Sequence, residues 1–148
     1  MSTPYAEGAP PSGAPGGKTS FMGLDSNVGA MLCYILNFLC CLGLVLSIVF
    51  VITEKENRFV RFHAMQSLFL SILQILVGLI VGILGLVLSL VLDMIHMGWL
   101  GWLLVLGLRL VLFLVFIALW IIAGIKAYGG QWYKLPLVGN FAWNTVNK

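Results

Sequence analysis

Formal charge is scarce in this 148-residue chain: eight Lys and Arg and five Asp and Glu together make up 9% of it. Soluble globular domains carry about 25% charged residues, so the chain has too few charges to cover a water-facing surface. The net charge of +3 is small, and the basic residues stand mostly at the ends of apolar segments. This placement is typical of contact with anionic headgroups rather than with nucleic acid. The composition therefore excludes an ordinary soluble domain.

Cysteine and histidine are also scarce. The three cysteines, Cys33, Cys40 and Cys41, all lie in one apolar run, and the only histidines are His63 and His96. An odd number of cysteines in an apolar run does not suit a secreted disulfide framework. Two adjacent cysteines without a nearby histidine do not have the spacing of a zinc site. We expect no metal, no cofactor and no enzymatic activity, because the serines of the apolar runs have no histidine at a matching depth.

What the chain does contain is three long apolar runs. Val28–Ile52 and Met65–Leu92 hold no formal charge, and Trp99–Ile125 holds one, Arg109. A helix needs roughly 20 apolar residues to cross a hydrocarbon core about 30 Å thick. The sequence therefore predicts an all-α integral membrane protein with three transmembrane helices over about 28–52, 65–92 and 99–125. A second interpretation of the first run stays open, in which a break near Cys40–Gly43 makes it a re-entrant hairpin; the single span is favoured.

The other segments are predicted to lie outside the hydrocarbon. Residues 1–24 are rich in Pro and Gly and are predicted to be a disordered tail. Residues 25–140 then form the transmembrane domain, and 141–148 form a short interfacial C-terminus near the aromatic residues that follow the third span. Lys and Arg gather after the first and third spans, so the positive-inside rule places the 53–62 loop and the C-terminus in the cytoplasm. The tail is outside for a single first span and cytoplasmic for a re-entrant one.

Small and polar residues form a stripe on each of the first two predicted helices. At 100° per residue, the second stripe falls within about 120° of the helix surface and includes Gly78, Gly82 and Gly85. The first stripe includes Cys33 and Asn37. Helices in lipid associate through close packing over small residues and through side-chain hydrogen bonds. The stripes predict helix–helix seams, within one chain or between copies, and we expect a homo-oligomer because they offer more contact surface than three helices need.

Two ionisable residues have more than one interpretation. Arg109 lies about 12 Å into its span at 1.5 Å per residue, where a charge is costly. It can extend outward to Asp93 or to headgroups, bond inward to Asn37 and Ser89, or line a polar path. His63, at the start of the second span, is interpreted as structural rather than as a proton relay, because no titratable residue lies between it and Asp93.

The most specific motif follows the first apolar run. It reads Glu54-x-x-Asn57-x-Phe59-Val60-Arg61-Phe62-His63-Ala64-x-Gln66-Ser67. A second motif follows the last run and reads Lys126-Ala127-Tyr128-x-Gly130-x-x-Tyr133-Lys134-Leu135-Pro136-Leu137. With the segment from Gly29 to Tyr34, these motifs extend over roughly residues 24–140. They resemble a family of small multi-pass membrane proteins of prokaryotes, which is distantly related to Tic-twenty, the chloroplast inner-envelope import component, and to some magnetosome membrane proteins.

The resemblance implies the plasma membrane of a prokaryote and no established activity. Its plastid relative is thought to form part of a protein-conducting channel, but that relative has four spans and a transit peptide. Here there are three apolar runs and no transit peptide. A translocon-like role is therefore a hypothesis that the resemblance supplies.

The two motifs are expected to meet on the cytoplasmic side, because each lies at that end of its span. His63 and Gln66 would then hold the Tyr128–Tyr133 segment against the start of the second span. The candidate interaction residues are Asn57, Arg58, Phe59, Arg61, Phe62, His63, Gln66, Ser67, Arg109, Asn37, Tyr128, Gly130, Tyr133, Lys134 and Pro136, and the helix-packing residues are Gly78, Gly82 and Gly85.

The sequence thus predicts a non-enzymatic structural or assembly component, or a translocon-like one, that acts through helix contacts and a cytoplasmic loop. The expected partners are anionic lipid headgroups, further copies of the chain and other membrane proteins. The alternative is a small ion or solute channel whose polar helix faces line a pore.

Overall fold

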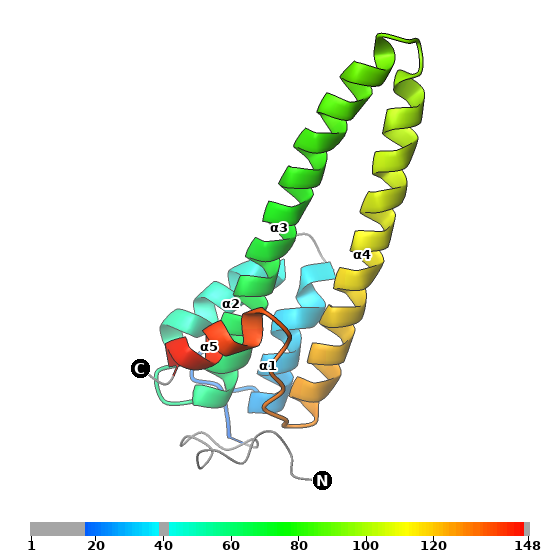
Figure 1. Cartoon of the computed structure of the whole chain (residues 1–148). Coiled ribbons are helices and arrows are strands. Elements are labelled where there is room, and N and C mark those ends of the chain that lie inside the picture. Colours follow the sequence, from blue (N-terminus) through cyan, green and yellow to red (C-terminus); the bar gives the residue numbers. More distant parts are fainter. Residues whose placement is uncertain (1–16, 39–41, 147–148) are drawn as a thin grey trace. The chain divides into compact units, whose positions relative to one another are not determined.

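The computed structural model describes residues 17–38 and 42–146, and in these ranges the chain forms helices and turns without a strand. The predicted all-α fold class is confirmed for this part of the chain. The elements in order are α1 (Ser26–Ile35), the 3-10 turn η1 (Leu36–Phe38), α2 (Leu42–Thr53), α3 (Arg58–Asp93), α4 (Gly98–Tyr128) and α5 (Val138–Val146) (Figure 1). Contacts divide the chain into two compact units. Unit 1 comprises Met1–Leu70 and Trp120–Lys148, and unit 2 comprises Ser71–Leu119.

The prediction of one continuous helix over 28–52 is wrong, because this apolar run forms two short helices, α1 and α2. At 10 and 12 residues, α1 and α2 are about 15 and 18 Å long, and neither can cross a bilayer alone. The chain reverses between them, so that a Cβ added to Gly43 would lie 2.5 Å from the backbone N of Asn37. The Asn37 amide also donates to the Cys33 carbonyl at 2.8 Å. The structure therefore has the broken form of the first run, with Cys40 and Cys41 outside the described residues.

The N-terminal end of α1 lies next to the C-terminal end of α2 in unit 1 (Figure 1). A Cβ on Gly29 would lie 3.6 Å from Cζ of the buried Phe50 ring. The two helices therefore form an antiparallel hairpin.

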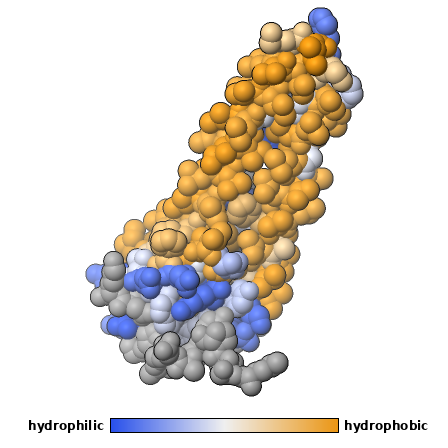
Figure 2. Space-filling view, viewed as in Figure 1, coloured by the Kyte–Doolittle hydropathy of each residue, from blue (hydrophilic) through white to orange (hydrophobic). Residues whose placement is uncertain are grey.

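The two long helices α3 and α4 contain the predicted spans 65–92 and 99–125, and both are long and apolar enough to cross a membrane. Their 36 and 31 residues correspond to about 54 and 46 Å. Only 11% of the most apolar 18-residue window of each helix is buried, whereas the core helix of a soluble protein would be mostly buried. The visible surface of unit 2 is accordingly almost uniformly apolar (Figure 2).

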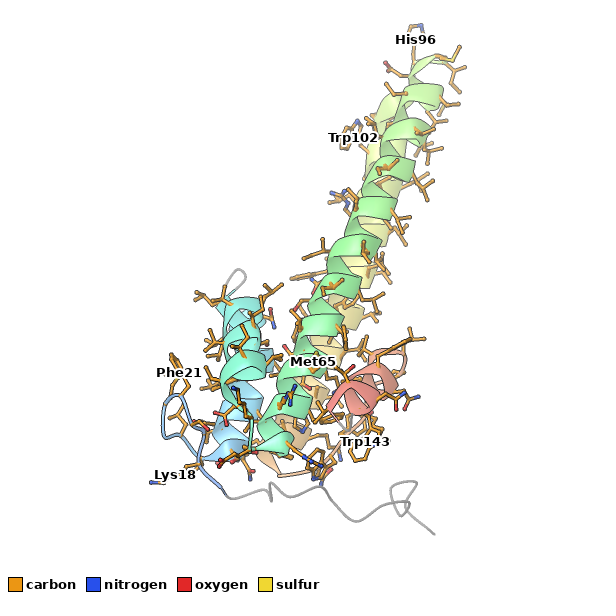
Figure 3. All side chains as sticks on the ribbon, turned by 90° about the vertical axis from the view of Figure 1, so that its left-hand side faces the viewer. Lys18, Phe21, Met65, His96, Trp102 and Trp143 are labelled. Carbon is orange, nitrogen blue, oxygen red and sulfur yellow. The ribbon has the colours of Figure 1, made fainter. Side chains whose placement is uncertain are left out.

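Within unit 2, α3 and α4 pack side by side over small residues. A Cβ on Gly85 would lie 2.5 Å from Val105, and one on Gly101 would lie 2.8 Å from Cα of Ser89. At these positions the predicted seam closes within one chain, whereas nothing lies within 4 Å of a Cβ on Gly78. Around Gly85 and Ser89, the small-residue surface that motivated the homo-oligomer is therefore covered by α4 of the same chain. The turn that joins the helices has His96 at its tip, with a φ of 58° (Figure 3).

The two ends of the domain differ from the sequence-based boundaries. Residues 17–24 belong to the predicted disordered tail, but they form a turn in which the Thr19 N–H donates to the Leu24 carbonyl at 2.7 Å. Phe21 projects from this turn and is exposed (Figure 3). Residues 1–16 lie outside the described part of the chain. At the other end, α5 crosses the predicted boundary between residues 140 and 141.

Candidate functional site

The first motif forms the start of α3, and most of its side chains point into unit 1. Asn57 caps the helix, because its Oδ1 accepts the Val60 N–H at 3.2 Å. The Asn57 amide also donates to Ser26 Oγ at the start of α1. The motif residues without exposed surface are Glu54, Phe59, Val60, Phe62, His63, Ala64, Gln66 and Ser67. The motif is therefore mainly a set of core contacts, whereas Arg58 is exposed and Arg61 is half-buried.

His63 links α1 to the segment that follows α4. Its Nε2 lies 3.1 Å from the Gln131 carbonyl oxygen, and its Nδ1 lies 3.1 Å from the hydroxyl of Tyr34. A carbonyl oxygen only accepts, so Nε2 carries the proton and Nδ1 of the neutral ring accepts the Tyr34 O–H. Both nitrogens are used inside the protein, and the ring has no exposed surface. This arrangement agrees with a structural histidine.

Gln66, one turn further along α3, has its whole amide bonded in the same way. Its Nε2 donates to the Tyr34 hydroxyl oxygen at 2.9 Å and to the Tyr133 carbonyl at 3.1 Å. Its Oε1 accepts the Leu135 N–H at 3.1 Å. Tyr34 was not among the residues singled out from the sequence, yet it connects Gln66 to His63. We call Tyr34, His63 and Gln66 the central triad.

A second layer of hydrogen bonds joins α1, α2 and α3 beside the central triad. Ser67 Oγ donates to the Cys33 carbonyl at 2.7 Å. Ser47 Oγ and the Asn37 amide donate to Ser67 Oγ at 3.1 and 3.2 Å. The predicted stripe of the first helix is therefore a seam within the chain.

The second motif reaches the central triad because α4 ends in a glycine turn. Gly130 has a φ of 70°, which a residue without Cβ adopts at little cost. The Gln131 N–H donates to the Lys126 carbonyl and the Gly130 N–H to the Ala127 carbonyl, both at 3.0 Å. This is the Schellman pattern, and it turns the chain back toward α3. α4 therefore ends at Tyr128, just before Gly129 and Gly130.

Aromatic side chains hold the returning segment in place. The Trp132 ring lies 5.3 Å from Phe59 and 5.5 Å from Phe62, and the Trp143 ring of α5 lies 5.6 Å from Trp132. Lys134 Nζ lies 4.1 Å from the centre of the Trp143 ring, a cation–π distance. Met65 of α3 packs in the same cluster (Figure 3). The predicted contact between the two motifs is confirmed, while its cytoplasmic placement stays a prediction.

Some motif residues are not part of this contact. Tyr128 and Pro136 are exposed, as are Arg58 at the start of α3 and Lys55 and Glu56 of the loop before it. Glu54, in contrast, is fully buried and accepts the Ser20 N–H at 2.6 Å and the Ser20 Oγ–H at 3.1 Å. Its carboxylate therefore fixes the 17–24 turn, a role that the sequence did not indicate.

Arg109 lies in unit 2, and its guanidinium faces Gly82 across the pair of long helices. A Cβ on Gly82 would lie 2.7 Å from one terminal nitrogen of Arg109. Arg109 also lines a groove of about 340 Å³, and the other lining residues are Gln74, Val77, Gly78, Val81, Leu112, Phe113 and Phe116. The predicted inward bond to Ser89 is wrong, because the buried Ser89 Oγ has no hydrogen-bond partner among the described residues.

Within the described ranges, no three His, Cys, Asp or Glu side chains gather as metal ligands would. The groups present are instead a closed polar network in unit 1 and a single cation in an apolar groove of unit 2. The first suits structural support, and the second suits an anion.

Known proteins similar to this chain are membrane proteins. Residues 25–142 match the magnetosome magnetite crystal formation protein family. A UPF0132 membrane protein of Methanocaldococcus jannaschii is 40% identical over 130 residues, which cover 85% of this chain and 92% of the relative. A UPF0132 membrane protein of Archaeoglobus fulgidus is 34% identical over 119 residues, which cover 80% of this chain and 93% of the relative. No solved structure matches the chain, and these matches indicate no catalytic family.

Proposed function

This chain belongs to the magnetosome magnetite crystal formation protein family, and from that premise we propose that it is a non-enzymatic assembly component of a prokaryotic plasma membrane. In this proposal α3 and α4 cross the bilayer, and unit 1 presents a contact surface to other membrane proteins on the cytoplasmic side. The α1–α2 hairpin enters the membrane from that side without crossing it.

The closed polar network of unit 1 carries the proposal. Both nitrogens of His63 and all polar positions of the Gln66 amide bond to groups of the same chain. A general base or a transport site must reach a proton or a solute. The polar atoms of His63 and Gln66 instead bond within the chain, where they join α1, α3 and the returning segment. The most specific motif therefore holds the fold of unit 1 together. A rigid unit 1 suits a protein that acts through contact with partners.

The residues left for contact are the exposed charges beside the network. Lys55 and Glu56 are exposed on the loop before α3, as is Arg58, the first residue of that helix. We call Lys55, Arg58 and the half-buried Lys126 and Lys134 the basic rim, which would also bind anionic headgroups at about 1 kcal/mol per basic residue near the surface. We assign the rim to partners and lipid, and the buried motif residues to the fold.

Site-specific photo-cross-linking in native membranes tests the assignment. A photoreactive residue in place of Arg58 should give adducts with other proteins. The matched position is Leu106, which is 66% exposed on α4 and should give lipid adducts. Arg58→Glu should lose the protein adducts formed from a probe at position 55 and keep the melting temperature, while Lys18→Glu, another exposed basic residue, should change neither. Adducts from position 58 with lipid alone would refute the contact surface.

A translocon-like role is the narrower form of this proposal, and its support is the resemblance to Tic-twenty. It requires that a protein in transit appear among the adducts at position 58. Partners that are all resident membrane proteins would leave the assembly role and rule out the translocon-like one.

A channel is the second candidate function, and the observation that favours it is Arg109 in the open groove of unit 2. Purified protein in planar bilayers should then give a conductance that Arg109→Leu alters. Silent bilayers with correctly inserted protein would dismiss the channel.

Self-association is proposed as well, although the small-residue seam no longer motivates it. The outward faces of α3 and α4 expose many leucines, such as Leu84 and Leu106 at 64% and 66%, and a second copy could cover part of this surface. Mass photometry in nanodiscs should show more than one copy per particle. A single chain at every lipid-to-protein ratio would refute self-association.

A further inference from the structure

The groove at Arg109 is a place where one exposed charge meets apolar surface partway along the two long helices of unit 2. Arg109 lies eleven residues after the first residue of α4, Gly98, which is about 16 Å along the helix. Gly82 lies eleven residues before the last residue of α3, Asp93. The guanidinium is thus at the level of Gly82, close to the middle of a hydrocarbon core about 30 Å thick. An intramembrane charge at that depth is costly and marks a functional position.

The absence of a side chain at Gly82 leaves the space that the Arg109 guanidinium occupies. With only 2.7 Å between a terminal nitrogen and the position of an added Cβ, any larger residue at 82 would displace the Arg109 head. The groove beside it continues along α3 and α4 over the apolar side chains of Val77, Val81 and Phe116. The result is a cation in a trough whose other lining residues are apolar except Gln74, and the trough opens to the surrounding lipid.

The chain itself has no suitable counter-charge for Arg109. Its five acids are Glu7, Asp25, Glu54, Glu56 and Asp93, and only Asp93 lies between residues 65 and 125. Asp93 ends α3 about 16 Å from the level of Gly82. A second copy in the same orientation would bring the same acids at the same depths. The anion must therefore come from another kind of molecule.

We propose that this groove binds a long-chain carboxylic acid, with its acid group at Arg109 and its alkyl chain along the trough. A volume of about 340 Å³ falls in the range of small-molecule pockets, roughly 300–1,000 Å³. The N–H donors of arginine suit the two oxygens of a carboxyl group.

The depth of the site selects a carboxylic acid over a phospholipid headgroup. A carboxylic acid can enter hydrocarbon in its neutral form, since its pKa is about 4 to 5 in water. A phosphodiester is ionised at all physiological pH values and would carry its charge to mid-bilayer at a high cost. The oxygen atoms of either the neutral or the ionised carboxyl group can accept from Arg109, so the acid gains this bond on arrival.

A photoreactive palmitic acid tests the site on the full chain in nanodiscs of zwitterionic lipid. Adducts should map to the groove segments 74–81 and 109–116, and unlabelled palmitic acid should compete, whereas the matching long-chain alcohol should not. Arg109→Gln should reduce labelling at least about tenfold, as the loss of a charge-assisted hydrogen bond predicts. Equal labelling of wild type and Arg109→Gln, or equal competition by the alcohol, would overturn the proposal.

Two alanine variants separate the site from a general effect on folding. Gly82→Ala keeps the charge but moves the guanidinium, and it should weaken labelling several-fold. Gly107→Ala is the matched control on α4, because nothing lies within 4 Å of a Cβ there, and it should label like wild type. Equal loss in both variants would overturn the proposal, as would preferential labelling of the groove by a photoreactive phospholipid or by another protein in native membranes. The site does not depend on the assembly role, whose readout is the adducts at position 58.

Discussion

Replacing Gln66 by Met should be the most damaging conservative change in unit 1. Methionine keeps the unbranched shape of glutamine and removes the amide. The change deletes the two donors to Tyr34 and Tyr133 and the acceptor for the Leu135 N–H. The variant isolates the polar contribution because the fully buried side chain is replaced by one of similar volume.

The magnitude follows from the groups that lose their partner. The Leu135 N–H becomes a buried backbone group without a hydrogen bond, which costs about 1–3 kcal/mol. The Tyr133 carbonyl is only partly buried, so its loss costs less. The Tyr34 hydroxyl still donates to His63, so its loss is smaller. We expect the free energy of unfolding to fall by about 1–5 kcal/mol, a large share of the ~5–15 kcal/mol typical of a folded protein.

Two measurements on the purified protein check this expectation. Denaturant unfolding in mild detergent gives the change in free energy, and hydrogen exchange reports whether the Leu135 amide loses protection before α3 does. Gln131→Met is the matched control, because that side chain is exposed and only its backbone carbonyl bonds to His63; it should change stability by less than about 0.5 kcal/mol. If Gln66→Met is as stable as the control and Leu135 stays protected, the network does not hold the two motifs together.

Two further variants test the turn that ends α4 and the carboxylate that fixes the 17–24 turn. Gly130→Ala should lower the free energy of unfolding by about 1–2 kcal/mol, because a residue with Cβ is strained at a φ of 70°, while Gly129→Ala should be neutral or stabilising in the same unfolding assay. Equal effects of the two would contradict the glycine turn. Glu54→Gln should speed tryptic cleavage after Lys18 several-fold, since Ser20 and Phe21 lose a charged acceptor, and the exposed Glu56→Gln should not. Unchanged cleavage in Glu54→Gln would show that the turn is held by other contacts.

The sequence predicted much of the local structure of the site. Asn57 could be recognised as a helix cap, and Gly130 as a helix end, because caps and glycine turns depend on a few adjacent residues. The contact between His63, Gln66 and the segment after α4 also followed, since adjacent spans bring their ends together. Tyr34 and Glu54 were missed as members of hydrogen-bond networks. Their partners lie about 30 residues away in the chain, and no pattern of nearby residues indicates such a pair.

Composition and apolar run length by themselves determined that the chain is helical and belongs in a membrane, because these depend only on how many residues avoid water and for how long. They could not decide whether the run 28–52 is one helix or two. That depends on whether Asn37 and Gly43 meet at a reversal and whether Cys33, Ser47 and Ser67 satisfy one another. Only the tertiary structure supplies such partners, because the residues that bond to one another come from three different helices and a buried polar group needs an acceptor or a donor.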